Sequence, residues 1–199
     1  MHHITIIGLN GPIGSGKTTI AKHLSTQEGV LRMSFAAPLK DMSSACFGIP
    51  REWFDDASKK ENPIEWLNGQ TCRSLCQNIG LYLRETHGSD IFVRIMRNKI
   101  NGLATAGGTK AIVIDDLRFD TEAEFICNET KGSIWRIENV EARGKKRAHA
   151  SHETEQGISE EYVDEVLENP LQEEWISSVV QPLFDKSVKQ EAQEGKGSQ

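Results

Sequence analysis

The stretch Gly11-Pro12-Ile13-Gly14-Ser15-Gly16-Lys17-Thr18 is a complete G-x-x-x-x-G-K-[ST] phosphate-binding loop. It follows the apolar run at residues 4–9 and precedes a helix-forming stretch that runs to about Leu24. In this setting, backbone N–H groups curl around a phosphate and the N-terminus of the helix adds its positive dipole. The sequence therefore predicts a nucleotide site, in which Lys17 reaches the β- and γ-phosphates and the Thr18 hydroxyl holds Mg²⁺.

The composition is typical of a soluble globular protein. The chain has 199 residues, of which 37% are hydrophobic and 26% are charged. It contains no apolar run as long as a membrane span and no secretory leader, so we expect a cytoplasmic protein. A net charge of −6 argues against a general nucleic-acid binder. The four cysteines form no C-x-x-C pair, so we expect reduced thiols and no zinc site.

The hydrophobic pattern predicts strands that alternate with helices. Strands are expected at residues 4–9, 30–35, 111–115, 133–138 and 163–167, and helices up to 24 and at 36–47, 71–86, 89–103, 121–129 and 172–184. This alternation implies a parallel sheet covered by helices, with the ligand at the carboxyl ends of the strands. We expect an irregular excursion at 48–70, a single domain over 1–186 and a disordered polar tail over 187–199.

A second phosphate-chemistry element is the apolar strand that ends in Asp115-Asp116 and is followed by Arg118. In P-loop proteins, a strand ending in a carboxylate supplies the partner that holds Mg²⁺ opposite the loop. We assign this role to Asp116, which could bind Mg²⁺ through water or steer the acceptor. Arg118 is expected to neutralise charge that develops during phosphoryl transfer. The alternative is a pair of surface acids, with Arg118 in an ion pair.

Two further segments have a charge pattern that suits nucleotides. The basic stretch at residues 143–147 is interpreted as a lid that closes over the nucleotide, or alternatively as a solvated loop. The helix at 71–84 has a polar face with residues three and four positions apart. These are Arg73, Gln77, Gly80 and Arg84. This face would cradle a nucleoside phosphate, although charged helix faces are also common at protein surfaces.

Five segments outside the phosphate-binding loop complete the pattern. They are Ser34-Phe35-Ala36-Ala37-Pro38-Leu39-Lys40; Arg73-Ser74-Leu75-Cys76-Gln77-Asn78-Ile79-Gly80 with Arg84; Asp90-Ile91-Phe92-Val93; Asp116-Leu117-Arg118-Phe119-Asp120-Thr121-Glu122; and His152-Glu153-Thr154-Glu155. With the loop, they resemble the phage-type deoxynucleoside monophosphate kinases of the P-loop kinase superfamily. The second and fourth match R-x-L-x-Q-x-x-G…R and D-x-R-F-x-x-E, and Phe92 stands where D-x-W-V has Trp. Together they cover most of residues 4–185.

The resemblance implies an α/β fold of three layers with a central parallel five-stranded sheet. It also implies a helical acceptor-site region at about 37–104 and a basic lid at about 139–158. ATP and Mg²⁺ are the implied cofactors, and ATP and a deoxynucleoside monophosphate are the implied ligands. Neither nucleic acid nor membrane is an expected partner, and a homodimer is the oligomer considered. For a phage protein, the expected compartment is the host cytoplasm.

The resemblance also implies a role for each matched residue. ATP contacts are expected from Gly11, Gly14, Ser15, Gly16, Lys17, Thr18, Thr19 and Asn169, the last in a loop beside the adenine. Acceptor contacts are expected from Ser34, Phe35, Lys40, Arg73, Gln77, Gly80, Arg84, Phe92, Asp116, Arg118 and Glu122. Phosphoryl transfer is expected to use Lys17, Asp116, Arg118, Glu122, Arg143 and Arg147, with Thr18 and Asp116 at the metal. Phe92 is expected to stack on the base without the indole N–H donor of Trp.

The predicted reaction converts ATP and a deoxynucleoside monophosphate into ADP and the diphosphate. Catalysis is then mostly positioning and charge neutralisation. One alternative is a P-loop kinase for another small phosphorylated metabolite, and another is a non-catalytic nucleotide-binding accessory protein. A regulatory GTPase is disfavoured because the sequence contains no N-K-x-D or D-x-x-G segment.

Overall fold

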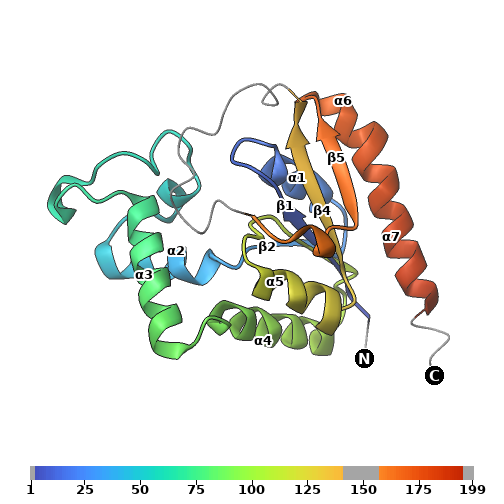
Figure 1. Ribbon diagram of the computed structural model, residues 1–199, viewed down its shortest axis with the longest axis horizontal. Helices are drawn as coiled ribbons and strands as arrows, with labels where there is room; N and C mark the ends of the chain where they lie inside the picture. Colours follow the sequence, from blue (N-terminus) through green and yellow to red (C-terminus); the bar gives the residue numbers. More distant parts are fainter. Residues whose placement is uncertain (1–2, 141–156, 195–199) are drawn as a thin grey trace. The chain divides into compact units, whose positions relative to one another are not determined.

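Five short segments form one parallel sheet (Figure 1). The strands are β1 (Thr5–Asn10), β2 (Val30–Met33), β3 (Ala111–Ile114), β4 (Ser133–Asn139) and β5 (Glu165–Asn169). Their order across the sheet is β2-β3-β1-β4-β5, and each neighbouring pair is parallel. β1 and β3 are buried along their whole length, as inner strands covered on both faces should be. The predicted α/β fold with a central five-stranded parallel sheet is confirmed.

The computed structural model describes residues 3–140 and 157–194, and the chain divides into two units. Unit 1 comprises Met1–Ser34 and Met96–Gln199 and contains the sheet, and unit 2 is Phe35–Ile95. Unit 2 overlaps the helical region that was predicted at about 37–104 over residues 37–95. Most of the predicted lid, residues 141–156, lies outside the described residues.

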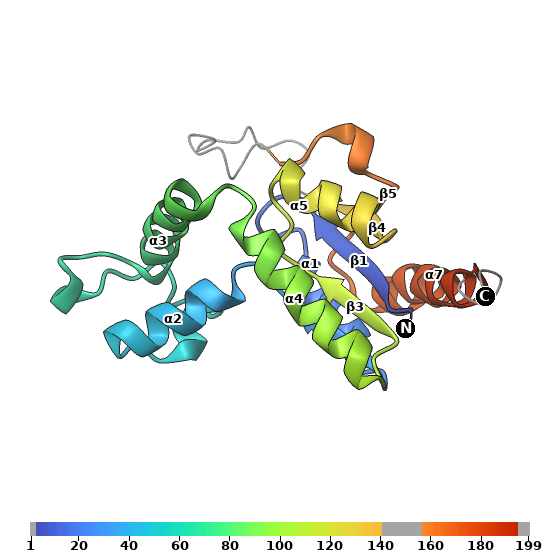
Figure 2. The ribbon, with the colours of Figure 1, turned by 90° about the horizontal axis from the view of Figure 1, so that it is seen from below.

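Helices cover both faces of the sheet in unit 1, which makes three layers (Figures 1 and 2). On one face, α1 (Lys17–Leu24) and α7 (Gln181–Glu194) bury apolar side chains against β1 and β3 in one core cluster. On the other face lies α5 (Asp120–Glu124), which continues as a π-helical segment, Phe125–Glu129. The helix α4 (Ile91–Ala106) joins this second layer, since Arg97 pairs with Glu129.

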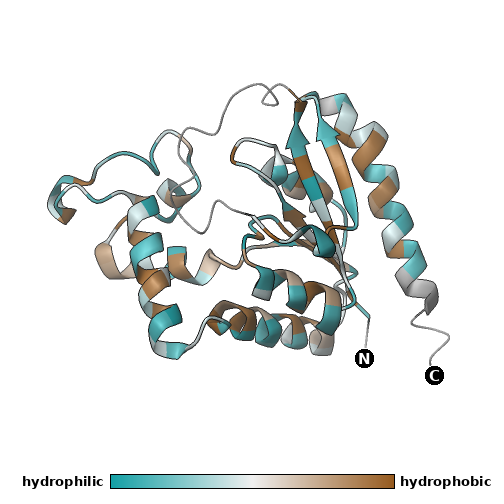
Figure 3. Cartoon of the chain, viewed as in Figure 1, coloured by the Kyte–Doolittle hydropathy of each residue, from teal (hydrophilic) through white to brown (hydrophobic). Residues whose placement is uncertain are grey.

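The C-terminal helix differs most from its prediction. A short helix α6 (Glu173–Trp175) and a π-helical segment, Ile176–Val180, lead into α7, which runs through Glu194. The sequence predicted disorder from residue 187. The helix continues past that point because its apolar residues recur at helical spacing as far as Val188, which packs against the core cluster. Figure 3 shows the resulting alternation of hydrophobic and hydrophilic residues along α7.

Unit 2 has a small core of its own. It contains α2 (Ala37–Phe47) and α3 (Cys72–His87), whose first turn is closed by a reciprocal capping box between Thr71 and Ser74. The buried core residues are Ile49, Phe54, Ile64, Cys72 and Leu75. Three of the five come from the predicted excursion at 48–70, so this irregular segment folds by burying apolar side chains. It contains two short 3₁₀ turns, Arg51–Phe54 and Glu65–Leu67.

None of the helices in the described part of the chain has the length and apolar content of a transmembrane segment.

Candidate functional site

The loop between β1 and α1 contains two glycines at which a side chain would collide with neighbouring atoms. Gly11 and Gly16 have φ values of 136° and 94°. A Cβ atom at Gly11 would collide with the carbonyl oxygen of Ile137, and one at Gly16 with the side-chain amide of Asn169. Gly16 precedes α1 and has no side chain to cap it, so the first N–H groups of the helix are directed toward the loop. This is the geometry of a phosphate site.

The side chain of Lys17 folds back over this loop. Its Nζ atom donates hydrogen bonds to the carbonyl oxygens of Gly11 and Pro12, both at 2.7 Å, and lies 3.3 Å from Ser15 Oγ. Burial, together with the positive charge of Arg118, lowers the pKa of Lys17 to about 8. An anion bound here would stabilise the charged ammonium group. The loop therefore holds a cation that favours a phosphate ligand.

The carboxylate of Asp115 joins the loop to the sheet. Its Oδ2 atom accepts hydrogen bonds from Thr18 Oγ1 at 2.8 Å and from Arg32 Nε at 2.9 Å, and it forms an ion pair with Arg32 Nη2 at 2.8 Å. Asp115 is 4% exposed. Because the Thr18 hydroxyl group donates its hydrogen bond to Asp115, the lone pairs of its oxygen atom remain available to a cation. The hydroxyl and the carboxylate are oxygen ligands of the kind that Mg²⁺ prefers, so these residues fit the metal.

The carboxylate beside Thr18 is therefore Asp115, whereas the sequence analysis assigned Asp116 to the metal. In the structure, Asp116 Oδ2 accepts a hydrogen bond from Ser34 Oγ at 2.7 Å. The alternation of side chains explains the difference. Val113 packs in the core cluster that includes α1, and Asp115 lies two residues further along the same face. The next residue, Asp116, is directed elsewhere and joins Ser34 at the ends of β2 and β3.

The segment that carries Arg118 is held by two buried side chains. Glu122 is 3% exposed, and its Oε2 atom accepts hydrogen bonds from the backbone N–H groups of Arg118 and Phe119, at 3.0 and 3.3 Å. Asn10 donates from its side chain to the carbonyl oxygen of Leu117 at 3.1 Å. The sequence analysis placed Glu122 at the transferred phosphate. These bonds show that it positions the backbone of Arg118.

A buried amide joins the end of β5 to the phosphate loop. Asn169 is 4% exposed and donates from Nδ2 to the carbonyl oxygen of Ser15 at 2.9 Å. Its Oδ1 atom accepts the N–H of Leu171 at 2.8 Å. Asn169 was expected beside the adenine, but its amide contacts the loop itself. Thr19, the other predicted ATP contact outside the loop, is exposed in the first turn of α1.

Arg136, on β4, anchors the segment that follows the predicted lid. It donates to Asn10 Oδ1 at 3.3 Å and to the carbonyl oxygen of Ile158 at 3.2 Å, and it pairs with Glu160. Asp120 accepts hydrogen bonds from the N–H and the hydroxyl of Ser159, at 2.7 and 2.6 Å. Residues 158–160 are thus attached to the same strand ends as the phosphate loop. The predicted lid arginines, Arg143 and Arg147, lie outside the described residues.

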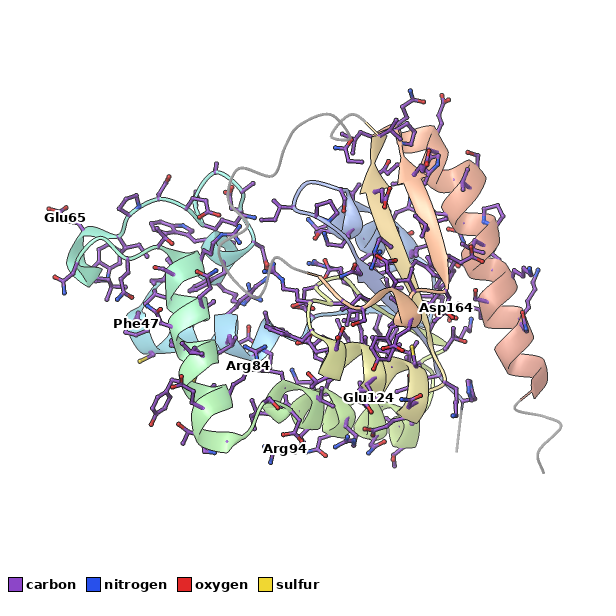
Figure 4. The ribbon with its side chains drawn as sticks, viewed as in Figure 1. Phe47, Glu65, Arg84, Arg94, Glu124 and Asp164 are labelled. Carbon is purple, nitrogen blue, oxygen red and sulfur yellow. The ribbon has the colours of Figure 1, made fainter. Side chains whose placement is uncertain are left out.

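In unit 2, the helix α3 carries the polar face that was predicted for the acceptor. Arg73 pairs with Glu61 through a 2.5 Å contact, and Gln77 is exposed. The guanidinium of Arg84, labelled in Figure 4, lies 4.6 Å from the centre of the Phe92 ring. Phe92 is 3% exposed, so its ring stacks on Arg84 in place of the expected base.

Three other predicted acceptor residues also make internal contacts. A Cβ atom at Gly80 would lie 3.4 Å from Arg84 Nη1, so this glycine leaves room for the guanidinium rather than for a sugar or base. Lys40 pairs with Asp55 at 2.6 Å, and Phe35 is 3% exposed. The structure therefore gives Gly80 and Phe92 the role of holding Arg84.

The sequence analysis missed four polar residues of the site. They are Asn10, Arg32, Asp115 and Arg136. Each is a polar side chain within a strand or directly after one, and a polar group in a buried strand needs a partner. That rule was the available signal, although it does not name the partner.

Comparisons with known proteins find a curated relative and solved structures, among them the following two proteins. A protein of Acanthamoeba polyphaga mimivirus, named "Putative deoxynucleotide monophosphate kinase", is 32% identical over 144 residues, which are 68% of this chain and 74% of that protein. The crystal structure of TT1252 from Thermus thermophilus superposes with a TM-score of 0.47 at 18% identity, over 93% of this chain and 98% of that one. No protein-family model matches the chain.

Proposed function

Because this chain belongs to the deoxynucleotide monophosphate kinase family, we propose that it transfers the γ-phosphate of ATP to a deoxynucleoside monophosphate. The products are ADP and the deoxynucleoside diphosphate. The observation that carries the proposal is the cluster of Lys17, Thr18 and Asp115, in which a partly buried ammonium group and two oxygen ligands meet at a phosphate-binding loop. The acceptor phosphate is ionised near neutral pH, so the reaction needs no strong general base.

The residues of unit 1 have complementary tasks in this reaction. The backbone N–H groups of the loop and Lys17 bind the ATP phosphates and orient them. Thr18 and Asp115 would hold Mg²⁺, which neutralises charge on the β- and γ-phosphates when it is bound. Arg118 is close enough to Lys17 for its charge to act on the lysine, so it can also act on the transferred phosphoryl group.

Each unit has polar groups that suit the acceptor, and each set is considered by itself. In unit 1 these are the pair formed by Ser34 and Asp116, at the carboxyl ends of the strands where ligands of parallel sheets bind. In unit 2, the helix α3 carries Arg73, Gln77 and Arg84. Arginine side chains can bind a phosphate through two parallel hydrogen bonds, and Gln77 is exposed for contact with a base edge.

The first test is a coupled ADP-release assay with ATP, Mg²⁺ and each of dAMP, dGMP, dCMP and dTMP, compared with the ribonucleotides. Turnover with one or more deoxynucleotides supports the proposal and identifies the acceptor. ADP release without any acceptor would indicate an ATPase instead. ATP binding without transfer to any of these nucleotides would favour a different phosphorylated acceptor or a non-catalytic binder.

Lys17→Ala tests the site that carries the proposal. Removing the ammonium group should lower kcat at least about a hundredfold, because one preorganised charge at the transferred phosphate is lost. Lys22→Ala is the matched control, since Lys22 is exposed on the same helix. Circular dichroism of both variants should match the parent protein. A Lys17→Ala enzyme with near-normal turnover would contradict the proposal.

A further inference from the structure

One carboxylate oxygen beside the phosphate loop lies close to three polar atoms. Asp115 Oδ2 accepts hydrogen bonds from Thr18 Oγ1 at 2.8 Å and from Arg32 Nε at 2.9 Å, and the Nη2 atom of the same guanidinium forms an ion pair with it at 2.8 Å. The Asp115 side chain is 3% exposed and that of Arg32 is 27% exposed. Hydrogen bonds between two charged groups are the strong ones, so this pair is a firm feature of the site.

The position of Arg32 in the sheet is explained by its pairing with Asp115. Arg32 lies on the same face of β2 as Val30, a member of the core cluster that includes α1. Its register partner on β3 is Val113, two residues before Asp115. A charged side chain on a face that packs against a helix is rare unless it is paired. Arg32 therefore stands at this position as the partner of Asp115.

The pairing of Arg32 with Asp115 lowers the negative charge of the ligands available to a metal ion. Arg32 neutralises Asp115, and the hydroxyl of Thr18 is an uncharged ligand. Two other charged groups act on Lys17, the positive Arg118 and the negative Asp116, and their opposite charges add no net charge to the site. Mg²⁺ binds through several oxygen ligands, usually with substrate phosphates among them. A free divalent ion would find weak ligands here, whereas a nucleotide brings the anionic oxygens that are missing.

We propose that Arg32 is a built-in counter-cation of Asp115 that makes metal binding at Thr18 and Asp115 conditional on the nucleotide. The inference rests on the proposed function, since it concerns the metal site of the same reaction. Arg32 acts through Asp115 and is a positioning residue. The metal then enters with the nucleotide, and the nucleotide-free site stays without a tightly held ion.

The test is a titration of the nucleotide-free protein with Mn²⁺, followed by electron paramagnetic resonance. Arg32→Met removes the counter-cation and should tighten Mn²⁺ binding about tenfold, because the charge of Asp115 becomes available to the ion. ATP should then strengthen Mn²⁺ binding by a correspondingly smaller factor in the variant than in the parent, since the coupling between two ligands is reciprocal.

Three controls separate this role from a change in net charge. Arg32→Lys keeps the positive charge and should leave the Mn²⁺ affinity within about threefold of the parent value. Arg97→Met removes the same charge from another two-point pair in unit 1, with Glu129 at 2.7 and 2.5 Å, and should leave it unchanged. Adding Asp115→Asn to Arg32→Met should abolish the gain.

Equal Mn²⁺ affinity in Arg32→Met and the parent protein overturns the proposal. A variant that has a lower melting temperature but the same Mn²⁺ affinity also overturns it. If Arg32→Met does not fold, Arg32→Gln gives the same test, because it removes the charge and keeps a hydrogen-bond donor. The titration contains neither ATP nor acceptor. A parent protein without kinase turnover would therefore refute the proposed function while leaving this measurement interpretable.

Discussion

The site of Lys17 destabilises the charged form of its side chain in the absence of a bound anion. It is enclosed by the loop whose carbonyl oxygens it contacts, and burial lowers its pKa from 10.5 to about 8. In the free protein, the ammonium group therefore begins to lose its proton close to physiological pH. A bound phosphate favours the charged form and raises this pKa again. Phosphate binding and protonation of Lys17 are thus linked.

The linkage predicts that ATP binding weakens as pH rises. Above about pH 8, free Lys17 is mostly neutral and must take up a proton when the phosphate binds. Between pH 7.5 and pH 9 the affinity should fall roughly eightfold. Isothermal titration calorimetry in two buffers of different ionisation enthalpy measures the proton uptake directly. Lys22→Met should retain the pH dependence, and a flat profile in the parent protein would show that Lys17 is not the linked group.

At the scale of elements, single side-chain contacts connect one segment to another that it supports. The amide of Asn169, at the end of β5, supports the backbone of Ser15 in the phosphate loop. On α3, Gly80 leaves the space in which the guanidinium of Arg84 stacks on Phe92. Asn169 and Phe92 are both buried, so small changes of side chain at these contacts should alter the elements that depend on them.

Asn169→Ala tests the contact between β5 and the loop. It leaves the buried carbonyl group of Ser15 without its partner, which should cost about 1–3 kcal/mol of unfolding free energy. The KM for ATP should rise severalfold while the KM for the acceptor stays the same. Urea denaturation and steady-state kinetics measure these effects. Val166→Ala, at a residue 51% exposed on the same strand, is the control, and an unchanged KM for ATP would contradict the role of Asn169.

Two glycine-to-alanine changes should differ in their effects on the acceptor KM and on stability. At Gly80 the new Cβ atom would lie 3.2 Å from Leu39 Cδ1 and 3.4 Å from Arg84 Nη1, so it would crowd both side chains and the KM for the acceptor should rise. At Gly102, within α4, no atom lies within 4 Å of the added carbon. Gly102→Ala should therefore raise the unfolding free energy by about 0.5–1 kcal/mol and leave both KM values unchanged. An acceptor KM unaffected by Gly80→Ala would refute the positioning of Arg84.

At the scale of the whole molecule, the two units have separate apolar clusters. The cluster of unit 1 lies between the sheet and the helices α1 and α7. The cluster of unit 2 joins the segment at 48–70 to α3 and shares no buried residue with the first. Each unit therefore buries apolar side chains in a cluster of its own. A part of a protein with its own buried cluster can unfold locally while the rest stays folded.

Phe54→Ala tests whether unit 2 opens as a unit. Phe54 is 5% exposed, and its truncation should cost about 3–5 kcal/mol in the stability of that cluster. Hydrogen exchange followed by mass spectrometry should show faster exchange in α3 and in residues 48–70, with β1 and β3 still protected. Phe184→Ala, in the cluster of unit 1, should expose the sheet instead. Equal acceleration throughout the chain after Phe54→Ala would show a single cooperative unit.

The sequence by itself determined the phosphate loop, the alternation of strands and helices, and the parallel five-stranded sheet. These follow from patterns within short segments: glycines ahead of a lysine, apolar runs of strand length and helical periodicity. Only the tertiary structure decided that Asp115, rather than Asp116, meets Thr18, that Arg32 pairs with it, and that Phe92 stacks on Arg84. The first two contacts join residues distant in the chain, and the third joins two successive helices. They depend on which strand face a helix covers and on which side chains then fill the space between them, and no local pattern contains that information.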